Sequence, residues 1–456
     1  SPNTDFQGDV TADEASFDSR TDAPTDAMND SDSHPYPTVA WSWETAFDPS
    51  VEFRPWVRWW WPGADVDDSK LASEIQLLAQ NGFGGAEIQP FNAALNPEAP
   101  ADELARRLAH DTPAFWAHVA CAMDAAIDSG LSLDLTLGSG WASGGNHISM
   151  DDSLHTLVHS EHVVQGPQSL TLALDGPDTP AFYEVSEMAA GFGEPLARYL
   201  PEEAELVAVV ASRKTGGVRE ANPFVITDSL ILDPASTVVL TDKVSGTGTL
   251  KWDVPTGEWV VVALFSMPDG EFPSLIAQPE PGFVVDHFNE ARFRANLEHL
   301  MGERTGMVPY YGAPLRGFFN DSFELKSERF FTDDFLAQFK ERRGYDATPY
   351  LPAMLIPGAD DHIFDGAGIA RKAPYSFGEM DERLQHDYAL TASELFIERF
   401  VKVCADFADK NGLKSRAQTY GLAVDVIRAS GESQIPEAEQ LYAGGSDLFL
   451  KAVSAG

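Results

Sequence analysis

The chain has 456 residues, of which 43% are hydrophobic and 11% aromatic, enough for a sizeable core and for two or three domains. This composition excludes a wholly disordered chain and a fibrous one. With 31 Lys and Arg against 71 Asp and Glu, the formal net charge is −40. Such a charge argues against duplex nucleic acid and anionic membranes as partners, because both attract basic patches.

Residues 1–35 form an acidic segment with eight Asp, one Glu and one Arg. The segment has few large apolar side chains, so it cannot bury enough surface to offset the entropy lost on ordering. We therefore predict a disordered tail. The remaining acidic residues are spread along the chain, which fits the hydrated surface of a secreted, periplasmic or cell-surface protein. Acidic surfaces also simply keep many proteins soluble.

Residues 36–150 alternate strand-like and helix-like segments. Helical periodicity appears in two segments, and short β-branched or aromatic runs surround them. In chain order we predict a strand, a helix, a strand, a helix and a strand over Arg54–Trp61, Asp67–Asn81, Gly84–Gln89, Thr112–Asp128 and Leu131–Leu137. Short connections between such segments are typical of the parallel βα units of a sheet or barrel.

Residues 151–280 have a different character, with many short β-like runs separated by Gly, Pro, Asp and Asn. They predict an inserted antiparallel, sandwich-like β domain. From residue 281 the first pattern returns. It predicts helices and strands in alternation over Phe288–Arg304, Leu315–Phe323, Thr332–Arg343, Leu384–Lys410 and Leu413–Thr419.

The alternation predicts an α/β fold, namely a (β/α)8 TIM-type barrel interrupted by the β domain. The sequence holds five recognisable parallel strands, whereas a closed barrel has eight. We therefore expect an incomplete barrel, with residues 281–456 forming a truncated set of further βα units. The chain begins with Ser, so we expect it to be processed or excised from a longer one.

Membrane insertion and a disulfide framework are not expected. The longest apolar stretch, Trp259–Phe265, has the length of a buried strand. The two cysteines, Cys121 and Cys404, lie in helix-like segments and are predicted to be free.

Carboxylates at the predicted strand ends are the candidates for chemistry, because reactive groups of a βα barrel lie there. They are Glu87, Asp321, Glu324, Glu437 and Glu439. Side chains that suit the apolar faces and hydroxyls of a sugar lie at the same ends: Trp60, Trp61, Gln89, Trp141, Asn146, His147 and Gln418. Glycoside hydrolysis commonly uses two carboxylates. The set therefore fits a sugar site, although acidic residues are abundant throughout this chain.

Other interpretations of single patterns stay open. The glycine-rich loop Gly138–Asn146 lacks the spacing and the lysine of a phosphate site. The pair Asp286-His287 follows a strand-like run or caps the next helix. A metal site is an alternative to a solvated polar cluster where the β region begins, at His155, His159, Glu161 and His162.

Seven motifs in this order resemble those of glycoside hydrolase family 106, the α-L-rhamnosidases. They are RPWVRWWWPG, NGFGGAEIQ, LDLTLGSGWASGG, FVVDHFN, FFNDSFE, FKERRGYD and RAQTYG…IPEAE, spanning Arg54 to Glu439. The resemblance implies a catalytic (β/α)8 barrel interrupted by β modules and a bound calcium ion. It also implies inverting hydrolysis of terminal α-L-rhamnosyl groups, and hence a rhamnose-containing glycan or glycoside as substrate.

By position, the resemblance gives Glu324 of DSFE a catalytic role and Glu437 of IPEAE a catalytic or calcium-holding one. Asp321 and Glu439 in the same elements match calcium ligands, which are hard oxygens. Sugar binding is predicted for the other strand-end side chains, Glu87, Gln89, Trp141, His147 and Gln418.

The resemblance departs at the end of the chain. Family members continue beyond the IPE element into a strand with a further essential Glu, whereas this sequence ends at KAVSAG. We therefore expect that the chain by itself can be inactive. The alternative functions are a non-catalytic carbohydrate-binding protein on a degenerate or truncated barrel and, less favoured, a metal-dependent hydrolase that uses the three histidines at 155–162. The oligomeric state is left open.

Overall fold

The computed structural model describes most of the chain in ranges separated by gaps. These are residues 43, 47, 49–92, 99–179, 197–218, 229–279, 282–327, 329–356, 358, 360–361 and 373–438. Residues 50–456 form one compact unit. Residues 1–49 form the other, in which the rings of Trp43 and Phe47 stack with centroids 5.9 Å apart. The predicted acidic tail, residues 1–35, lies outside the described residues.

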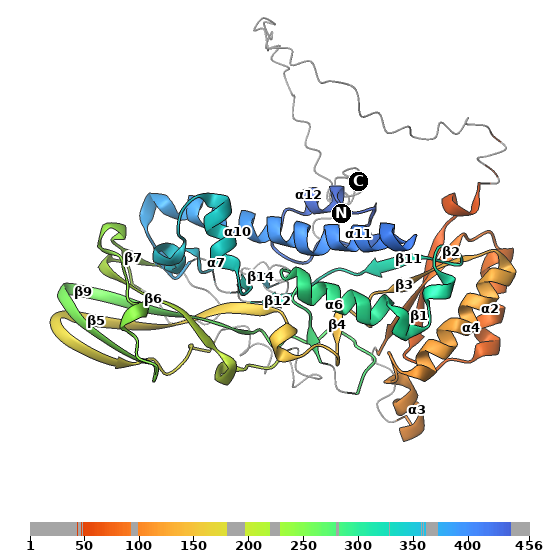
Figure 1. Ribbon diagram of the computed structural model, residues 1–456, viewed down its shortest axis with the longest axis horizontal. Helices are drawn as coiled ribbons and strands as arrows, with labels where there is room; N and C mark the ends of the chain where they lie inside the picture. The colour runs from red at the N-terminus through yellow and green to blue at the C-terminus, as the bar shows by residue number, and fades with distance from the viewer. Residues whose placement is uncertain are drawn as a thin grey trace, which may run out of the picture. The chain divides into compact units, whose positions relative to one another are not determined.

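The centre of the fold is a six-stranded parallel sheet with the order β1-β2-β3-β11-β16-β17 (Figure 1). Its strands are β1 (Trp56–Pro62), β2 (Gly85–Phe91), β3 (Ser132–Thr136), β11 (Leu315–Asn320), β16 (Lys414–Ala417) and β17 (Ile435–Pro436). In register, Arg58 lies beside Glu87 and Glu87 beside Asp134. The five strands predicted for this pattern are confirmed, and β17 is a sixth. Among the described residues the sheet does not close on itself.

Helices α2 (Asp68–Gln80) and α4 (Pro113–Ser129) pack against each other beside β1–β3 (Figure 1). Each begins at a residue whose side chain accepts a backbone N–H, Asp67 for α2 and Thr112 for α4. Both helices were predicted to within a few residues. Helix α3 (Ala101–Arg107) was not, because its seven residues have no buried face to give a hydrophobic period.

The second half of the chain supplies the other helices. They are α6 (Glu290–Met301), α7 (Phe335–Arg343), α8 (Leu351–Met354), α10 (Asp381–Phe396), α11 (Lys402–Asn411) and α12 (Val426–Gly431). The long helix predicted over Leu384–Lys410 is present, with one π-helical turn at Ile397–Val401 between α10 and α11. Helix α6 contacts α11, so the two lie side by side, as Figure 1 also shows.

The antiparallel sheet has seven strands and is dominated by three long ones. These are β5 (His155–Ala173), β9 (Thr249–Pro268) and β6 (Glu205–Gly216), with β9 in the middle. Four short strands complete the sheet: β7 (Leu230–Leu232), β8 (Val238–Val239), β13 (Phe330–Phe331) and β15 (Tyr375–Ser376). Two separate antiparallel pairs join β4 (Gly144–Gly145) to β10 (Phe283–Val284) and β12 (Lys326–Ser327) to β14 (Asp360–Asp361).

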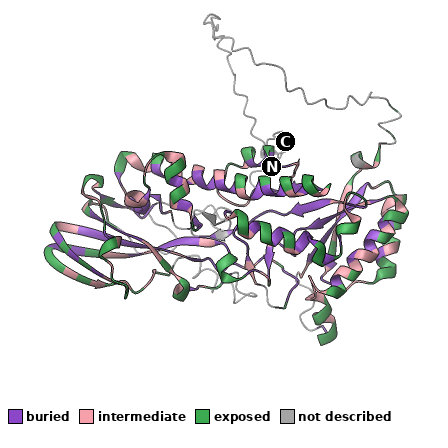
Figure 2. Ribbon diagram, viewed as in Figure 1, coloured by how far each residue is buried: buried purple, intermediate pink, exposed green. Residues whose placement is uncertain are grey.

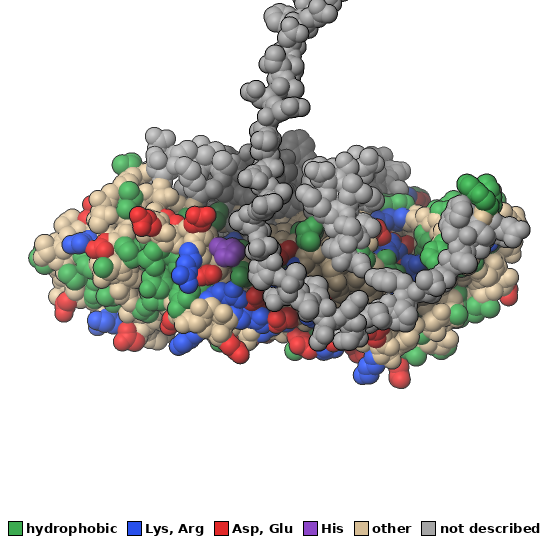
Figure 3. Space-filling view, turned by 90° about the horizontal axis from the view of Figure 1, so that it is seen from above, with side chains coloured by type: hydrophobic (Ala, Val, Ile, Leu, Met, Phe, Trp, Pro, Cys, Tyr) green, Lys and Arg blue, Asp and Glu red, His purple; other side chains and the backbone are tan. Residues whose placement is uncertain are grey.

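Burial follows this division into sheets. A large apolar cluster joins the parallel sheet to its helices, and a smaller one lies under the antiparallel sheet around Val209, Val261 and Ala263. Figure 2 shows the buried strands of the parallel sheet and the exposed outer faces of α2 and α4. On the face seen in Figure 3, acidic and basic side chains are interspersed.

The structure thus shows a mixed α/β protein with one parallel and one antiparallel sheet. Within the described ranges, no helix is both long and apolar enough to cross a membrane. The domain boundaries given above stay predictions.

Candidate active site

The predicted site residues come from the carboxyl ends of neighbouring parallel strands. Asp321 follows β11, Gln418 follows β16 and Glu437 follows β17, while Glu87 and Gln89 lie within β2. Backbone hydrogen bonds tie these ends together, from Gln418 N to Asn320 O at 3.0 Å and from Glu437 N to Ala417 O at 2.9 Å. Because carboxyl ends of parallel strands meet at one edge of a sheet, the fold gathers these side chains.

Arg416 of β16 joins three carboxylates on the inner face of the sheet. Its Nη1 lies 2.8 Å from Asp134 Oδ2, its Nε lies 2.6 Å from Glu437 Oε2, and its Nη2 donates to Glu87 Oε2. The guanidinium is largely buried, and burial works against its charge. The three carboxylates outweigh that effect and raise the pKa of Arg416, so it stays a cation.

Arg58 of β1 forms a second bridge between the same strands. Its guanidinium lies 3.2 Å from Glu87, 3.2 Å from Asp321 and 3.8 Å from Glu437. The side chains of Glu87 and Asp321 are almost fully buried, whereas that of Glu437 is 32% exposed. Burial raises the pKa of Glu87, and Arg416 and Arg58 oppose that shift. The accessible carboxylate of this network is therefore Glu437.

A pocket of about 590 Å³ opens onto this network. Its volume is in the range of small-molecule sites. Side chains from five strands line it: Trp56, Val57, Arg58, Trp60, Glu87, Arg316, Arg416, Ile435 and Glu437. Trp60 is 44% exposed at its rim, while the neighbouring Trp61 is buried in the core. Of the two tryptophans predicted to suit a sugar, only Trp60 is placed to do so.

Glu437 is held by a neutral donor as well as by the two arginines. The amide of Gln418 donates to Glu437 Oε1 at 2.9 Å, and the hydroxyl of Tyr420 donates to Gln418 Oε1 at 2.7 Å. Gln418 and Tyr420 are both buried. The orientation of the Glu437 carboxylate is therefore fixed from inside the fold.

Glu324 has different partners. Trp141 donates its indole N–H to Glu324 Oε2 at 2.9 Å, and Ser322 donates its hydroxyl to Oε1 at 3.0 Å. The residue has a φ of 44°, in the left-handed region that a non-glycine residue seldom occupies. Backbone bonds on either side, from Phe323 N to Tyr420 O and from Leu325 N to Gly421 O, hold this conformation.

Gln89 and Trp141 belong to the same end of the sheet. Gln89 is fully buried, accepts from Thr136 and lies 3.4 Å from the carbonyl of Gly140. Thr136 also donates to Glu87 at 3.2 Å. Gln89 thus connects the loop that carries Trp141 to the Arg416 network, and its buried amide supports the site from behind.

His147 lies apart from these carboxylates. Its ring stacks on His299 with centroids 3.9 Å apart and planes 2° from parallel. His299 bonds Asp111, whose carboxylate also accepts from Arg304. Burial works against the Asp111 charge, but these two hydrogen bonds hold its pKa well below the usual value. The residue predicted to bind substrate is thus part of a separate polar cluster.

Asp111, His147 and His299 are close enough to suggest a metal site. The stacking argues against one, because a metal lies in the ring plane of each histidine that binds it. Two parallel rings direct their lone pairs along parallel lines, so they cannot both aim at one ion. Arg304 also places a positive charge on the shared carboxylate.

The calcium ligands predicted from the family resemblance can be tested against the donors in place. Asp321 faces Arg58, and Glu437 faces Arg416 and Arg58, so both candidate oxygens already have cationic partners. Calcium prefers six to eight oxygen ligands, and no such set gathers around Asp321 within the described residues. These residues do not fit the ion as they stand. Glu439 lies outside the described residues.

The other predicted alternatives receive no support from the geometry. In the described part of the chain His155, His159 and His162 do not meet as a three-ligand cluster. Asp286 caps nothing in α6, which begins after Asn289; it accepts instead from Phe288 N and Thr332.

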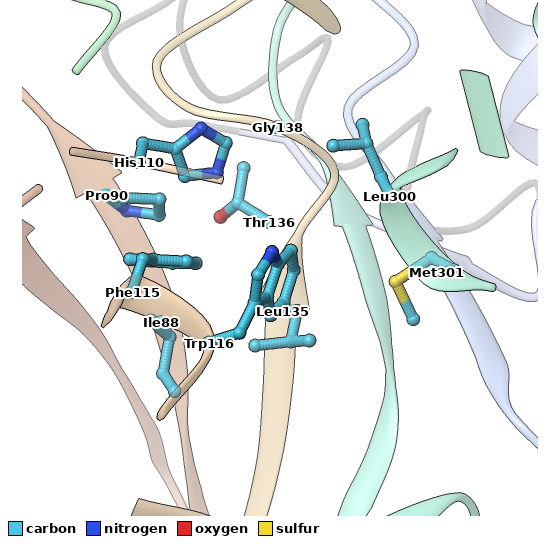
Figure 4. A pocket seen from close by; sticks show the side chains of 10 residues that line it. All are labelled: Ile88, Pro90, His110, Phe115, Trp116, Leu135, Thr136, Gly138, Leu300 and Met301. Atoms are coloured by element: carbon cyan, nitrogen blue, oxygen red, sulfur yellow. The ribbon is translucent and has the colours of Figure 1, made fainter. Parts of the chain in front are cut away.

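A second cavity, shown in Figure 4, lies between β2, β3, α4 and α6. His110 and Thr136 face it together with apolar side chains. Its volume is about 10 Å³, which holds about one water molecule and no sugar ring.

Sequence reasoning missed the basic half of the site. Arg58, Asp134 and Arg416 were not among the candidates, although each occupies an inward position of a strand. The signal was present, because a charged residue at an alternate position of an otherwise apolar strand, as in LDLTL, must face a charged interior.

Comparison with known proteins places this geometry in a family. The family model described as alpha-L-rhamnosidase matches residues 47–225 and 214–446. A curated protein of Formosa agariphila named "Putative beta-glucuronidase" is 24% identical over 408 residues, which are 87% of this chain and 32% of that protein.

A solved structure, the rhamnosidase from Novosphingobium sp. PP1Y, shares the fold. The TM-score is 0.59 at 18% identity, covering 87% of this chain and 49% of that one. The chain thus spans about a third of the length of the curated relative and about half of that of the solved structure. Since the family model covers most of the sequence, the chain belongs to the α-L-rhamnosidase family of glycoside hydrolases, family 106.

Proposed function

We propose that this chain carries catalytic residues of a glycosidase that removes terminal α-L-rhamnosyl groups from glycans or glycosides. The observation that supports this most is the pair of carboxylates, Glu324 and Glu437, at the ends of strands in one parallel sheet. Each is oriented by its own buried donors. The (β/α)8 barrel predicted from the sequence is part of the same proposal, with the six parallel strands as one section of its wall.

The two carboxylates suit different roles because their partners differ. Glu437 lies between Arg416 and Arg58, which stabilise a negative charge, so we assign it the part of general base toward water. Glu324 accepts only from the neutral groups of Trp141 and Ser322 within the described residues, which suits a group that must carry a proton. Paired carboxylates in contrasting environments are how glycosidases separate acid from base.

Inversion is part of the proposal. An inverting pair needs room for a water between its carboxyl groups, roughly 6.5–9.5 Å. The supporting observation is that Glu324 and Glu437 come from different strand ends and share no partner in the described residues. Calcium stays a prediction of the family resemblance, and because the described donors do not fit it, no step of the mechanism is assigned to it.

The test is hydrolysis by the protein in its full natural length of an aryl α-L-rhamnoside, followed by NMR of the first sugar released. We expect turnover and an inverted anomer. Glu324→Gln should lower kcat by about 10²–10⁴-fold, the contribution of a general acid. A leaving group that needs no protonation, such as dinitrophenolate, should largely rescue the variant. Turnover of Glu324→Gln at the wild-type rate would remove Glu324 from this role.

The same assay separates the competing functions. Turnover of an aryl β-glucuronide in place of the rhamnoside would transfer to this chain the activity named for the Formosa relative. Sugar binding by calorimetry without any turnover would instead favour a carbohydrate-binding protein. Addition of a chelator tests the calcium prediction, since loss of activity that calcium alone restores would support it.

A further inference from the structure

We propose that Asn296 of α6 is a positioning residue that sets the place of Trp141 and, through its indole, the Glu324 carboxylate. This inference rests on the proposed function for its kinetic consequence. The geometry that supports it lies outside the carboxylate network, in the contact between α6 and the loop after β3. Asn296 is 1% exposed and is not among the predicted site residues.

The loop in question runs from Gly138 to His147 and carries Trp141 near its middle. Its first half is fixed by the chain after β2 and by the segment before β10. Ser139 donates to Pro90 O at 2.9 Å, Gly140 N donates to Pro90 O at 3.0 Å, and Trp141 N donates to Ser274 O at 3.2 Å. These bonds position one side of Trp141.

Asn296 holds the second half of the loop at two points. Its Nδ2 donates to Ser143 Oγ at 2.9 Å, and its Oδ1 accepts from His147 Nε2 at 2.8 Å. Three residues further along α6, His299 stacks on the ring of His147. One helical face therefore grips the loop by a side-chain amide and an imidazole, since residues three apart on a helix are neighbours.

The two anchored halves meet at Trp141. Its indole N–H is one of two donors to Glu324, whose backbone is held at a φ of 44°. A shift of the loop moves this donor away from the carboxylate. Displacements of about 1 Å at a reacting group can cost about 10²-fold in rate. The buried amide of Asn296 thus acts on the reaction through Trp141, without touching the substrate.

The imidazole tautomer makes Asn296 hard to replace. An amide oxygen only accepts, so His147 must carry its proton on Nε2. Burial, and then the nearby His299, lower the pKa of His147 to about 4, which keeps the ring neutral. Asn296→Ala leaves both Ser143 and His147 without this partner. Asn296→Asp keeps the shape, because its carboxylate accepts from both groups.

The test is a double-mutant cycle on an aryl α-L-rhamnoside. Asn296→Ala should lower kcat about tenfold or more with KM within threefold, and Asn296→Asp should recover most of that loss. In a Trp141→Phe background, Asn296→Ala should add almost nothing, because residues that act through one contact are not additive. An equal loss in both backgrounds would overturn the inference.

A second readout does not depend on activity. In a ¹H–¹⁵N spectrum the indole resonance of Trp141 is identified by its absence in Trp141→Phe. It should shift in Asn296→Ala and return in Asn296→Asp; an unmoved resonance contradicts the inference even if the wild-type protein hydrolyses no rhamnoside. If Asn296→Ala does not fold, Ser143→Ala removes one of the two contacts and should give the same changes at smaller size.

Discussion

The two sheets have opposite interiors. The inner face of the parallel sheet carries Arg58, Glu87, Asp134 and Arg416, all in mutual ion pairs. The core of the antiparallel sheet consists of apolar side chains such as Val209, Val261 and Trp252. Both were assembled by strands of the same chain, so the difference lies in what each sheet has to do.

Apolar burial is the cheaper way to stabilise a sheet. Each buried charge loses its hydration, and ion pairing in the interior often only recovers that loss. The antiparallel sheet accordingly gains its stability from burying apolar area. The parallel sheet keeps four carboxylates and its arginines because they fix the orientation of Glu437. The comparison therefore predicts that equivalent substitutions in the two sheets have unequal effects.

The largest effect is expected for Arg416→Met. It leaves Glu87 and Asp134 buried with less compensation, and removing one partner of a buried pair costs about 3–5 kcal/mol of stability. The matched control in the antiparallel sheet is Arg213→Met, which breaks a half-exposed pair with Asp233 and should cost at most about 1 kcal/mol. Urea unfolding of both variants measures the difference. Equal losses would mean that the inner-face charges do not form a coupled network.

The second effect falls on activity. Gly421 has a φ of 88°, and a Cβ there would lie 2.4 Å from the backbone nitrogen of Glu324. Gly421→Ala must therefore displace Glu324, and we expect a fall in kcat of about 10²-fold. The control is Gly344→Ala, at the end of α7, which has a φ of 79° and nothing within 4 Å.

Both glycine variants suffer similar backbone strain, of order 1–3 kcal/mol. Their thermal transitions should therefore fall by comparable amounts while only Gly421→Ala loses activity. Loss of activity in Gly344→Ala to the same degree would show that strain anywhere in the fold, and not the position of Glu324, limits the rate.

The sequence was sufficient for most elements of the parallel sheet. The strands from β1 to β16 and helices α2 and α4 have clear periods and caps, such as Asp67 and Thr112, that local chemistry dictates. It was also sufficient for the positions of Glu324 and Glu437 at strand ends. Local pattern could not give β17, because two residues carry no period.

The partners of the site could not be obtained from the sequence. Arg416 and Asp134 are 282 residues apart, and their contact depends on strand order, which periodicity does not encode. His147 shows the opposite failure. It follows a strand end, as a substrate ligand would, but the loop turns its ring toward His299 and Asn296. Being near a strand end fixes where a backbone lies, and packing decides where the side chain points.

The smallest effect concerns acid. His287 is fully buried among Phe293, Phe323 and Phe400, and burial lowers its pKa from 6.5 to about 3. The unfolded chain binds a proton at this ring below pH 6.5, while the folded chain does not until about pH 3. Unfolding therefore takes up a proton in this window, and the stability that His287 contributes above pH 6.5 is lost as the pH falls.

His287→Phe should flatten that dependence, so that urea midpoints of the variant and the wild type converge or cross as the pH falls from 7 to 4. Burial raises the pKa of the neighbouring Asp286, which acts in the opposite direction in both proteins and cancels in the difference. Phe293→Leu is the control, since it loosens the same cage without removing a titrating group and should shift the curve without changing its slope. A parallel shift in His287→Phe as well would show that the ring is protonated in the folded protein. That outcome would place a charge inside the aromatic core and remove the contrast between charged strand faces and apolar packing from which the prediction is drawn.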